Sequence, residues 1–231
     1  MEQTNSPAVP GHIRSFVKRG GRLTAAQARA LAELWPRYGV EFTPGALDFD
    51  ALFGRRAPRV VEIGFGNGEA LVELAASHPE QDFLGIEVHP PGVGHCLLAI
   101  AARDLTNVRL SRHDAIEVLQ GQIPESTLDE VLLYFPDPWP KKRHHKRRIV
   151  RPEFITLVAT RLRCAGVLRL ATDWAPYAEA MTEVLERCDV LENVADSNRY
   201  VERPASRPLT RFERRGQRLG HEVFDLAYRR R

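Results

Sequence analysis

The sequence predicts an α/β fold with a doubly wound, mostly parallel sheet. From residue 59 onward, short apolar segments alternate five times with longer segments of helical periodicity. This alternation is typical of a parallel sheet with helices on both faces. Acidic residues also lie at the ends of the predicted strands, where ligands bind in sheets of this type. Together, the two observations predict a ligand-binding α/β domain.

The N-terminal quarter of the chain shows a different pattern. Residues 1–12 are polar and contain prolines, which predicts a disordered tail. After a short basic arm, a helix is predicted over residues 24–35, with Thr24 as its N-cap and Gln27 completing a capping box. Pro36 is expected to end or kink this helix.

Residues 39–58 are expected to form a linker with little regular structure, and five strand–helix units follow it. The predicted strands cover residues 59–64, 82–88, 107–114, 128–138 and 166–174. The predicted helices cover residues 69–78, 91–104, 115–122, 152–163 and 176–188. We therefore divide the chain into a tail (1–12), an N-terminal arm with a helix and linker (13–58), and an α/β domain with a basic C-terminal segment (59–231).

The composition indicates a globular cytoplasmic protein. Hydrophobic residues make up 43% of the 231 residues, which suffices for a full core. The longest apolar run, residues 96–102, is too short to span a bilayer, and the N-terminus lacks the apolar stretch of a signal peptide. The cysteines Cys96, Cys164 and Cys188 form no C-x-x-C pair and are expected to be reduced, buried thiols.

Charge is unevenly distributed along the chain, although the net charge is only +3. Residues 1–139 contain 12 basic residues (Lys or Arg) and 18 acidic residues (Asp or Glu). Residues 140–231 contain 21 basic and 12 acidic residues. Such asymmetry indicates a polyanionic partner for the second half, with a solvated basic surface as the alternative. The most basic stretch is residues 141–148, where every residue is Lys, Arg or His.

A glycine-rich turn joins the first predicted strand to its helix. Gly64, Gly66 and Gly68 permit a tight turn that a ligand can approach closely. Glu87 lies 19 residues beyond Gly68 and ends the second predicted strand, where a carboxylate can accept both hydroxyls of a ribose.

Two further acids lie at the same edge. Asp114 ends the third predicted strand, where it can accept from an adenine amino group, and Glu62 precedes the glycines, where it can face a cationic group. A diphosphate would favour helix N–H groups and few acids. The edge therefore fits S-adenosylmethionine better than NAD, and a site without a ligand is the remaining alternative.

The fourth predicted strand ends in F-P-D-P-W. Pro136 and Pro138 restrict the backbone on either side of Asp137, so the turn holds one carboxylate still at the edge that faces the transferable methyl group. A simple rigid strand exit is the alternative. In the basic stretch that follows, His144 and His145 are adjacent and no third ligand is evident, so no metal site is predicted.

The sequence resembles the bacterial tRNA (guanine-N7)-methyltransferase family, often called TrmB, from residue 14 onward. The basic block and the C-terminal motif are specific to that family, whereas the glycine motif is common to many methyltransferases. The residues that carry the resemblance are EIGFGNG (62–68), GIEVH (85–89), HDA (113–115), FPDPWPKKRHHKRR (135–148), ATDW (171–174), RPASRPLTRFERRG (203–216) and LGHEVFDL (219–226).

The resemblance implies a seven-stranded methyltransferase sheet whose last strand, in residues 221–229, is antiparallel. It implies methylation of N7 of the variable-loop guanine of tRNA, usually position 46, with Asp137 as the proposed catalytic residue. Beside the three glycines, the implied cofactor contacts are Glu62, Glu87, Asp114 and Asp137. The implied substrate contacts are Lys141, Asp173, Thr210, Arg211, Phe212 and Glu213.

A tRNA substrate gives the basic residues a role, because cations beside the pocket can hold the phosphates that flank the target base. Phe135, Trp139 and Trp174 are candidate stacking surfaces for that base, with core packing as the alternative. The expected backbone contacts are Lys142, Arg143, Lys146, Arg147 and Arg148. The basic track is expected to continue through Arg203, Arg207, Arg211, Arg214 and Arg215.

The chemistry requires alignment more than proton transfer, because guanine N7 carries a lone pair at neutral pH. A carboxylate near the purine can orient it and stabilise its developing positive charge. Asp137 and Asp173 are candidates, and the sequence does not divide the roles. The alternatives are a methyltransferase for an amide or amino nitrogen, another RNA or nucleobase methyltransferase, and a non-catalytic RNA-binding protein. We expect a monomer rather than a homodimer.

Overall fold

The computed structural model describes residues 15–16, 21–195, 199–205, 207–209, 213–214, 220 and 222–231. The predicted tail and half of the basic arm, residues 14 and 17–20, lie outside these residues. None of the described helices is long and apolar enough to cross a membrane.

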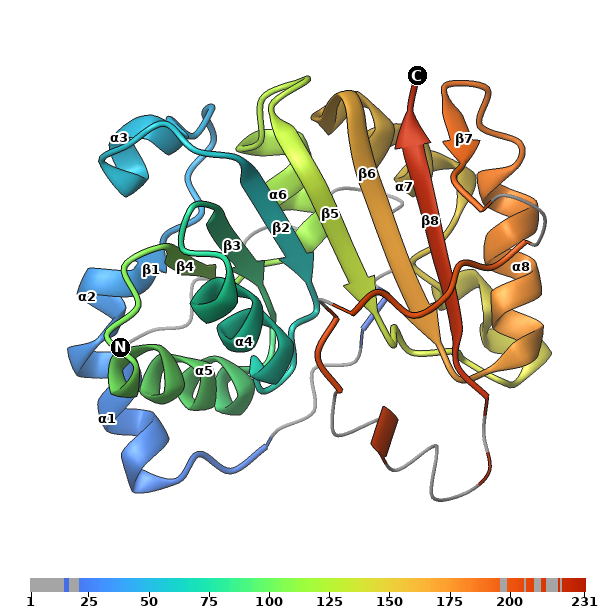
Figure 1. The fold of residues 1–231 in the computed structure, drawn as a ribbon. Coiled ribbons are helices and arrows are strands. Elements are labelled where there is room, and N and C mark those ends of the chain that lie inside the picture. The colour runs from blue at the N-terminus through green and yellow to red at the C-terminus, as the bar shows by residue number, and fades with distance from the viewer. Residues whose placement is uncertain are drawn as a thin grey trace.

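The described strands form one mixed sheet in the order β1-β4-β3-β2-β5-β6-β8-β7 (Figure 1). The sheet is parallel except for β8, which pairs antiparallel with both β6 and β7. The predicted fold class and the antiparallel last strand are thus confirmed, with eight strands instead of seven. The strands are β1 (Gly39–Val40), β2 (Arg59–Ile63), β3 (Asp82–Ile86), β4 (Val108–Ser111), β5 (Leu128–Tyr134), β6 (Leu162–Thr172), β7 (Leu191–Asn193) and β8 (Phe224–Arg230).

Helices cover both faces of the sheet (Figure 1). One face is covered by α1, α4 and α5, and the other by α6, α7 and α8. The helices are α1 (Ala25–Glu33), α2 (Trp35–Tyr38), α3 (Phe49–Phe53), α4 (Glu69–Ser77), α5 (Pro90–Ala102), α6 (Ala115–Gly121), α7 (Pro152–Arg161) and α8 (Ala175–Leu185), with a 3₁₀ helix η1 (Lys142–Arg147). The five predicted strand–helix units are all present.

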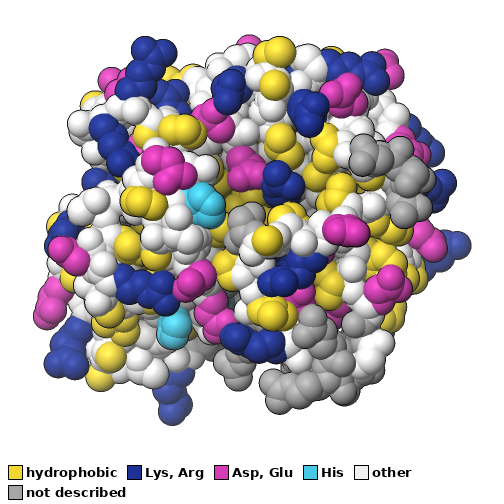
Figure 2. Space-filling model, in the orientation of Figure 1, with side chains coloured by type: hydrophobic (Ala, Val, Ile, Leu, Met, Phe, Trp, Pro, Cys, Tyr) yellow, Lys and Arg dark blue, Asp and Glu magenta, His cyan; other side chains and the backbone are white. Residues whose placement is uncertain are grey.

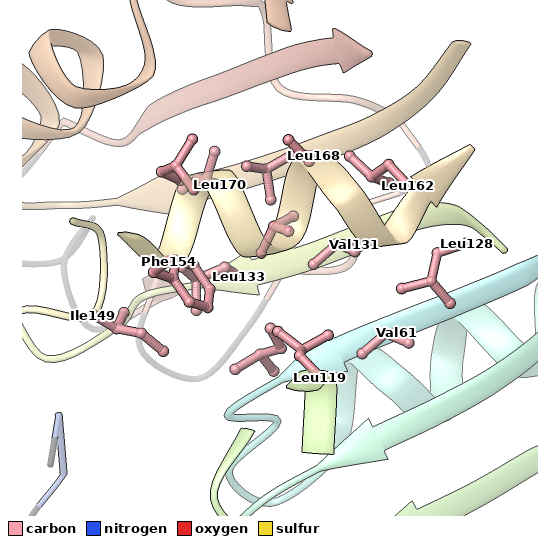
Figure 3. Packing of buried hydrophobic residues seen from close by; sticks show 14 of the residues in the cluster. Val61, Leu119, Leu128, Val131, Leu133, Ile149, Phe154, Leu162, Leu168 and Leu170 are labelled. Atoms are coloured by element: carbon pink, nitrogen blue, oxygen red, sulfur yellow. The ribbon is translucent and has the colours of Figure 1, made fainter. Parts of the chain in front are cut away.

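The core consists of two apolar layers separated by the sheet. Along β5, Val131 and Leu133 face α7, whereas Leu132 and Tyr134 face the side of α4 and α5, as the two-residue period of a strand requires. Figure 3 shows the first layer, where Phe154 of α7 packs near Leu133. Because both faces are buried, the strands are held rigidly and their carboxyl ends form a fixed edge.

The N-terminal region agrees only in part with the prediction. The capping box of α1 is confirmed, since Thr24 and Gln27 exchange two hydrogen bonds. Pro36 lies in the first turn of a second short helix, α2. Residues 39–58 are mostly irregular, as expected of a linker, but they contain two short elements that the prediction did not include, because β1 pairs with β4 and Asp48 caps α3. Elements of two and five residues are too short to show a recognisable period.

The cysteine prediction was also only partly right. The three thiols are free, and Cys96 is buried in α5. Cys164 is exposed and Cys188 half-buried, so burial of all three is not observed.

Candidate active site

The turn between β2 and α4 brings the backbone to the carboxyl edge of the sheet. Gly64, Gly66 and Gly68 have φ angles of +71°, +58° and +80°, which other residues rarely adopt. A Cβ atom at Gly68 would also lie 2.3 Å from Cys96 Sγ. Apart from the adjacent residues in the chain, no described residue has an atom within 4 Å of a Cβ built at Gly64 or Gly66. The turn is therefore packed against α5 at one end and open at the other.

Glu87 follows β3 and holds the glycine turn in place. Its Oε2 accepts a hydrogen bond from the Gly66 N–H at 2.9 Å. Its Oε1 accepts from the N–H groups of Val88 at 2.7 Å and His89 at 3.0 Å. Since each carboxylate oxygen has two lone pairs, Glu87 retains acceptor capacity for a ligand hydroxyl. The predicted ribose acceptor thus lies against the predicted glycine turn.

Glu62 lies on β2 with a side chain that is only 3% exposed. Its Oε2 is buried and has no hydrogen-bond partner in the part of the chain that the structure describes. Burial, and next the negative charge of Glu87, raise the pKa of Glu62 to about 8. A buried carboxyl group of this kind, next to the open part of the glycine turn, suits a ligand that supplies a cationic donor.

Asp114 caps α6 at the end of β4. Its Oδ1 accepts from the Ile116 N–H at 2.9 Å, and the side chain is buried. The strands β2, β3 and β4 are parallel neighbours, and Glu62, Glu87 and Asp114 lie at or near their carboxyl ends. The structure therefore brings these three of the four predicted cofactor acids to the same edge.

Asp137 lies on the turn that follows β5, the neighbour of β2 on the other side. The strand was predicted to cover residues 128–138, but β5 ends at Tyr134. Phe135 and Trp139, at the two ends of the turn, have φ angles of 51° and 45°, a region that bulky side chains rarely adopt. Asp137 is exposed between them, and none of the described residues donates a hydrogen bond to its carboxylate.

Asp173 and Trp174 follow β6, the next strand along the edge. Asp173 is half-buried, and Trp174 is exposed at the N-terminus of α8. Because β5 and β6 are parallel neighbours, Asp173 and Asp137 leave the sheet at the same edge. The two acids for which a substrate-facing role was predicted therefore lie at one edge of the sheet.

The basic stretch forms the short helix η1, with Lys141 at its N-cap. Lys141, Lys142, Arg143 and Lys146 are exposed, and the guanidinium of Arg147 lies 5.0 Å from the centre of the Trp139 ring. These cations therefore lie beside the Asp137 turn. On the face shown in Figure 2, cationic and anionic side chains are interspersed, so no uniformly basic surface covers that side.

Two arginines differ from the prediction that they contact tRNA phosphates. Arg148 is only 7% exposed and donates through Nε to the Pro138 carbonyl at 2.9 Å. Arg207 is 1% exposed and forms ion pairs with Glu213 and Asp225. Both guanidinium groups are directed into the protein, so neither is available to a phosphate in this structure. The charge pattern alone could not reveal this burial.

The rest of the C-terminal motif is described only in part. Thr210, Arg211, Phe212 and Arg215 lie outside the described residues. Glu213, predicted to contact substrate, is 1% exposed and accepts from Arg207. The exposed Arg214 pairs with Glu69, at 3.2 Å.

Sequence reasoning missed Tyr177 and did not foresee that Arg148 and Arg207 make inward contacts around the Asp137 turn. Tyr177 of α8 is fully buried, and the Arg148 guanidinium lies 4.6 Å from the centre of its ring. Arg207 lies 5.7 Å from the centre of the Phe135 ring. The apolar residues Ile149 and Val150, which immediately follow Arg148, were the only sequence signal that the basic block turns inward there. Within the described ranges, no cluster of side chains suits a metal ion.

Both the sequence and the fold are similar to those of known proteins. Residues 56–226 match the model of a family described as putative methyltransferase. A tRNA (guanine-N(7)-)-methyltransferase of Leifsonia xyli subsp. xyli is 57% identical over 223 residues, which cover 96% of this chain and 98% of that protein. A protein of Alkalilimnicola ehrlichii with the same name is 59% identical over 221 residues, covering 95% of this chain and 93% of that protein.

A solved structure, that of 16S rRNA methyltransferase KamB, has a similar fold. Its TM-score is 0.59 at 17% sequence identity, and the match covers 84% of this chain and 98% of that chain. At this level of identity the likeness concerns the fold alone.

Proposed function

The chain belongs to the tRNA (guanine-N(7)-)-methyltransferase family, and we propose that it transfers a methyl group from S-adenosylmethionine to N7 of the variable-loop guanine of tRNA, position 46. The observation that carries the proposal is the near full-length identity of 57–59% to enzymes with that name. The acids and glycines at one sheet edge support it.

The cofactor is proposed to bind where the glycine turn meets the three buried or half-buried acids. Glu62 would accept from the ligand's ammonium group, which would satisfy its orphaned Oε2. Glu87 would accept from the ribose hydroxyls and Asp114 from the adenine amino group. Gly64 and Gly66 leave room for close approach of the ligand to the backbone, whereas Gly68 allows the turn to pack against Cys96 of α5. Asp137 borders the site at the next strand.

When bound, S-adenosylmethionine supplies an activated methyl group on a sulfonium. Guanine N7 needs no general base, so the protein's task is to align N7 with the methyl group in line and to exclude water. Asp137 is proposed to accept from the N1–H and amino group of guanine and to stabilise the positive charge that develops on the purine. The exposed position of its carboxylate on a restrained turn supports this role.

The tRNA is proposed to lie across the exposed cations next to this turn. Lys142, Arg143, Lys146 and Arg147 would contact backbone phosphates. Further substrate contacts are proposed for Lys141, Asp173, Thr210, Arg211 and Phe212. For Glu213, the ion pair with Arg207 supports an indirect role in shaping the C-terminal segment. We propose that the enzyme acts as a cytoplasmic monomer.

The proposal is tested by transfer of label from S-adenosylmethionine to an unmodified tRNA transcript. The modified nucleotide is mapped by borohydride and aniline cleavage. The matched control is the same transcript with 7-deazaguanine at the target position, which lacks the N7 atom alone. We expect cleavage at the variable-loop guanine and no label in the control transcript.

Other outcomes distinguish the alternatives. Label at another base would indicate a different RNA methyltransferase. Binding of tRNA by a folded protein without any transfer would favour a non-catalytic RNA-binding role.

A further inference from the structure

The Asp137 carboxylate receives no hydrogen bond from any described residue, so its position depends on the backbone of its turn. The start of the turn is fixed by a hydrogen bond from the Phe135 N–H to the Ala171 carbonyl of β6 at 2.8 Å. Left-handed conformations at Phe135 and Trp139 are costly and persist only when their surroundings hold them. A restraint is therefore needed at the second half of the turn.

Arg148 provides a contact at that point. Its Nε donates to the carbonyl of Pro138, the residue directly after Asp137, at 2.9 Å. One face of the guanidinium lies against the Tyr177 ring, with 4.6 Å between Cζ and the ring centre. A second nitrogen of the group lies 3.2 Å from His145 Nε2 in η1. Because arginine is only a donor, a hydrogen bond between the two groups requires this His145 nitrogen to accept.

The surroundings of Arg148 are unusual for a buried cation. It is 7% exposed, yet it forms no ion pair with a carboxylate among the described residues, and burial lowers its pKa. Arg161 makes a similar contact elsewhere, because its Nε donates to the Leu119 carbonyl at 2.7 Å. Arg161 is also paired with Glu125 at 3.2 Å. A buried charge without a carboxylate partner is unfavourable for stability, which points to a role in the site.

We propose that Arg148 is a positioning residue that fixes the Asp137 carboxylate through the Pro138 carbonyl and ties the same turn to η1 through His145. The inference rests on the proposed function, since it assigns Asp137 to the methyl-transfer site. The backbone supports it as well, because Arg148 is the C-cap of η1 and its backbone N–H donates to the His145 carbonyl at 2.9 Å. Arg148 thus connects the phosphate-binding segment and the turn that carries the carboxylate.

The test compares the Arg148→Lys variant with wild type in single-turnover methyl transfer at saturating tRNA and S-adenosylmethionine. Lysine keeps the charge, but its ammonium cannot contact the Pro138 carbonyl, His145 and the Tyr177 ring in the same way. We expect the rate constant to fall roughly 30- to 100-fold, because small displacements of a catalytic group cost about that much. The dissociation constant for tRNA, measured by filter binding, should change less than about threefold, since the exposed phosphate contacts of η1 remain.

Two further variants complete the experiment. Arg161→Lys removes a comparable arginine–carbonyl contact at the C-terminal end of α7. This variant should have a lower melting temperature and an unchanged rate constant. His145→Ala alters an exposed residue and removes one acceptor of Arg148 without threatening the fold. It should slow transfer about fivefold, the effect of one hydrogen bond.

The outcomes separate this inference from the proposed function. No transfer to guanine N7 by folded wild-type protein would overturn the proposed function. With active wild type, an unchanged rate constant in Arg148→Lys, or a loss of rate matched by an equal loss of tRNA affinity, would overturn the positioning role. If Arg148→Lys does not fold, His145→Ala decides, because wild-type rate in that variant contradicts the inference.

Discussion

Arg207 and Glu213 form a bidentate ion pair although each side chain is only 1% exposed. The two hydrogen bonds measure 2.6 and 3.0 Å. Arg207 also contacts Asp225 of β8 at 2.7 Å and lies over the Phe135 ring. The pair therefore connects the C-terminal segment to the sheet and to the first residue of the Asp137 turn.

Replacement of Arg207 by Ala is expected to destabilise the protein strongly. The variant removes the cation that the buried Glu213 and Asp225 share, while the longer contact of Glu213 with Arg203 at 3.3 Å remains. Removal of one partner of a buried pair typically costs about 3–5 kcal/mol. Urea denaturation monitored by circular dichroism measures the free energy of unfolding. Arg214→Ala is the control, because Arg214 is 54% exposed in its pair with Glu69 and exposed pairs contribute about 0–1 kcal/mol. Equal losses in both variants would contradict the structural role of the buried pair.

Asp137→Ala is expected to abolish turnover while the fold and tRNA binding stay largely intact. The side chain is exposed, so its loss should change stability by less than about 0.5 kcal/mol. Loss of one charge-stabilising group should lower the rate constant by at least about 100-fold. Single-turnover transfer, tRNA filter binding and thermal melting separate these effects. A loss of tRNA affinity equal to the loss of rate would show that Asp137 acts in binding instead.

The fold was predictable because strong periodic patterns specify it. Each of the five strand–helix units has enough apolar residues at one spacing to be recognised, and strand order then brings Glu62, Glu87 and Asp114 together. β1 and α3 were missed because their stability comes from contacts with β4 and from a cap, which leave no period in the sequence.

The site was less predictable than the fold because charge does not reveal orientation. Arg147 and Arg148 are consecutive members of one basic block, yet Arg147 lies over Trp139 while Arg148 is buried beneath the turn. Arg207 likewise forms buried contacts through partners 6 and 18 positions away in the sequence. Only tertiary contacts distinguish a phosphate-binding arginine from one that holds a turn.

Neutralising Lys142, Arg143 and Lys146 together is expected to weaken tRNA binding and flatten its salt dependence. If each contacts one phosphate, the slope of log K against log salt concentration should decrease by about 0.7–0.9 per residue, and by about 2–3 in total. Filter binding from low to moderate salt measures the slope. Arg103→Gln is the control, because Arg103 pairs with Glu73 on the surface of α5 and α4, away from η1. An unchanged slope in the triple variant would remove the phosphate-contact proposal.

Glu62 is expected to make the ligand-free protein less stable as pH rises. Its pKa is raised from 4.5 to about 8 in the folded protein, so between these values the folded state binds a proton that the unfolded state has lost. Stability therefore decreases with increasing pH across this window, by at most about 1.4 kcal/mol per pH unit from this group. Urea denaturation of wild type and Glu62→Gln at several pH values isolates the contribution. The free energy of unfolding of Glu62→Gln should increase relative to that of wild type from pH 5 to pH 8.

The same carboxyl group predicts proton release on cofactor binding. A cationic ligand next to Glu62 favours its ionised form, so binding near pH 7 should expel a proton. Calorimetry in two buffers of different ionisation enthalpy counts that proton, and the Glu62→Gln variant should release none and bind more weakly. If wild type releases no proton and its stability parallels that of Glu62→Gln at every pH, Glu62 is already ionised in the free protein. The orphaned Oε2 would then have to be satisfied by solvent in the free protein, and only weaker binding by Glu62→Gln would still assign the ammonium of the ligand to this carboxylate.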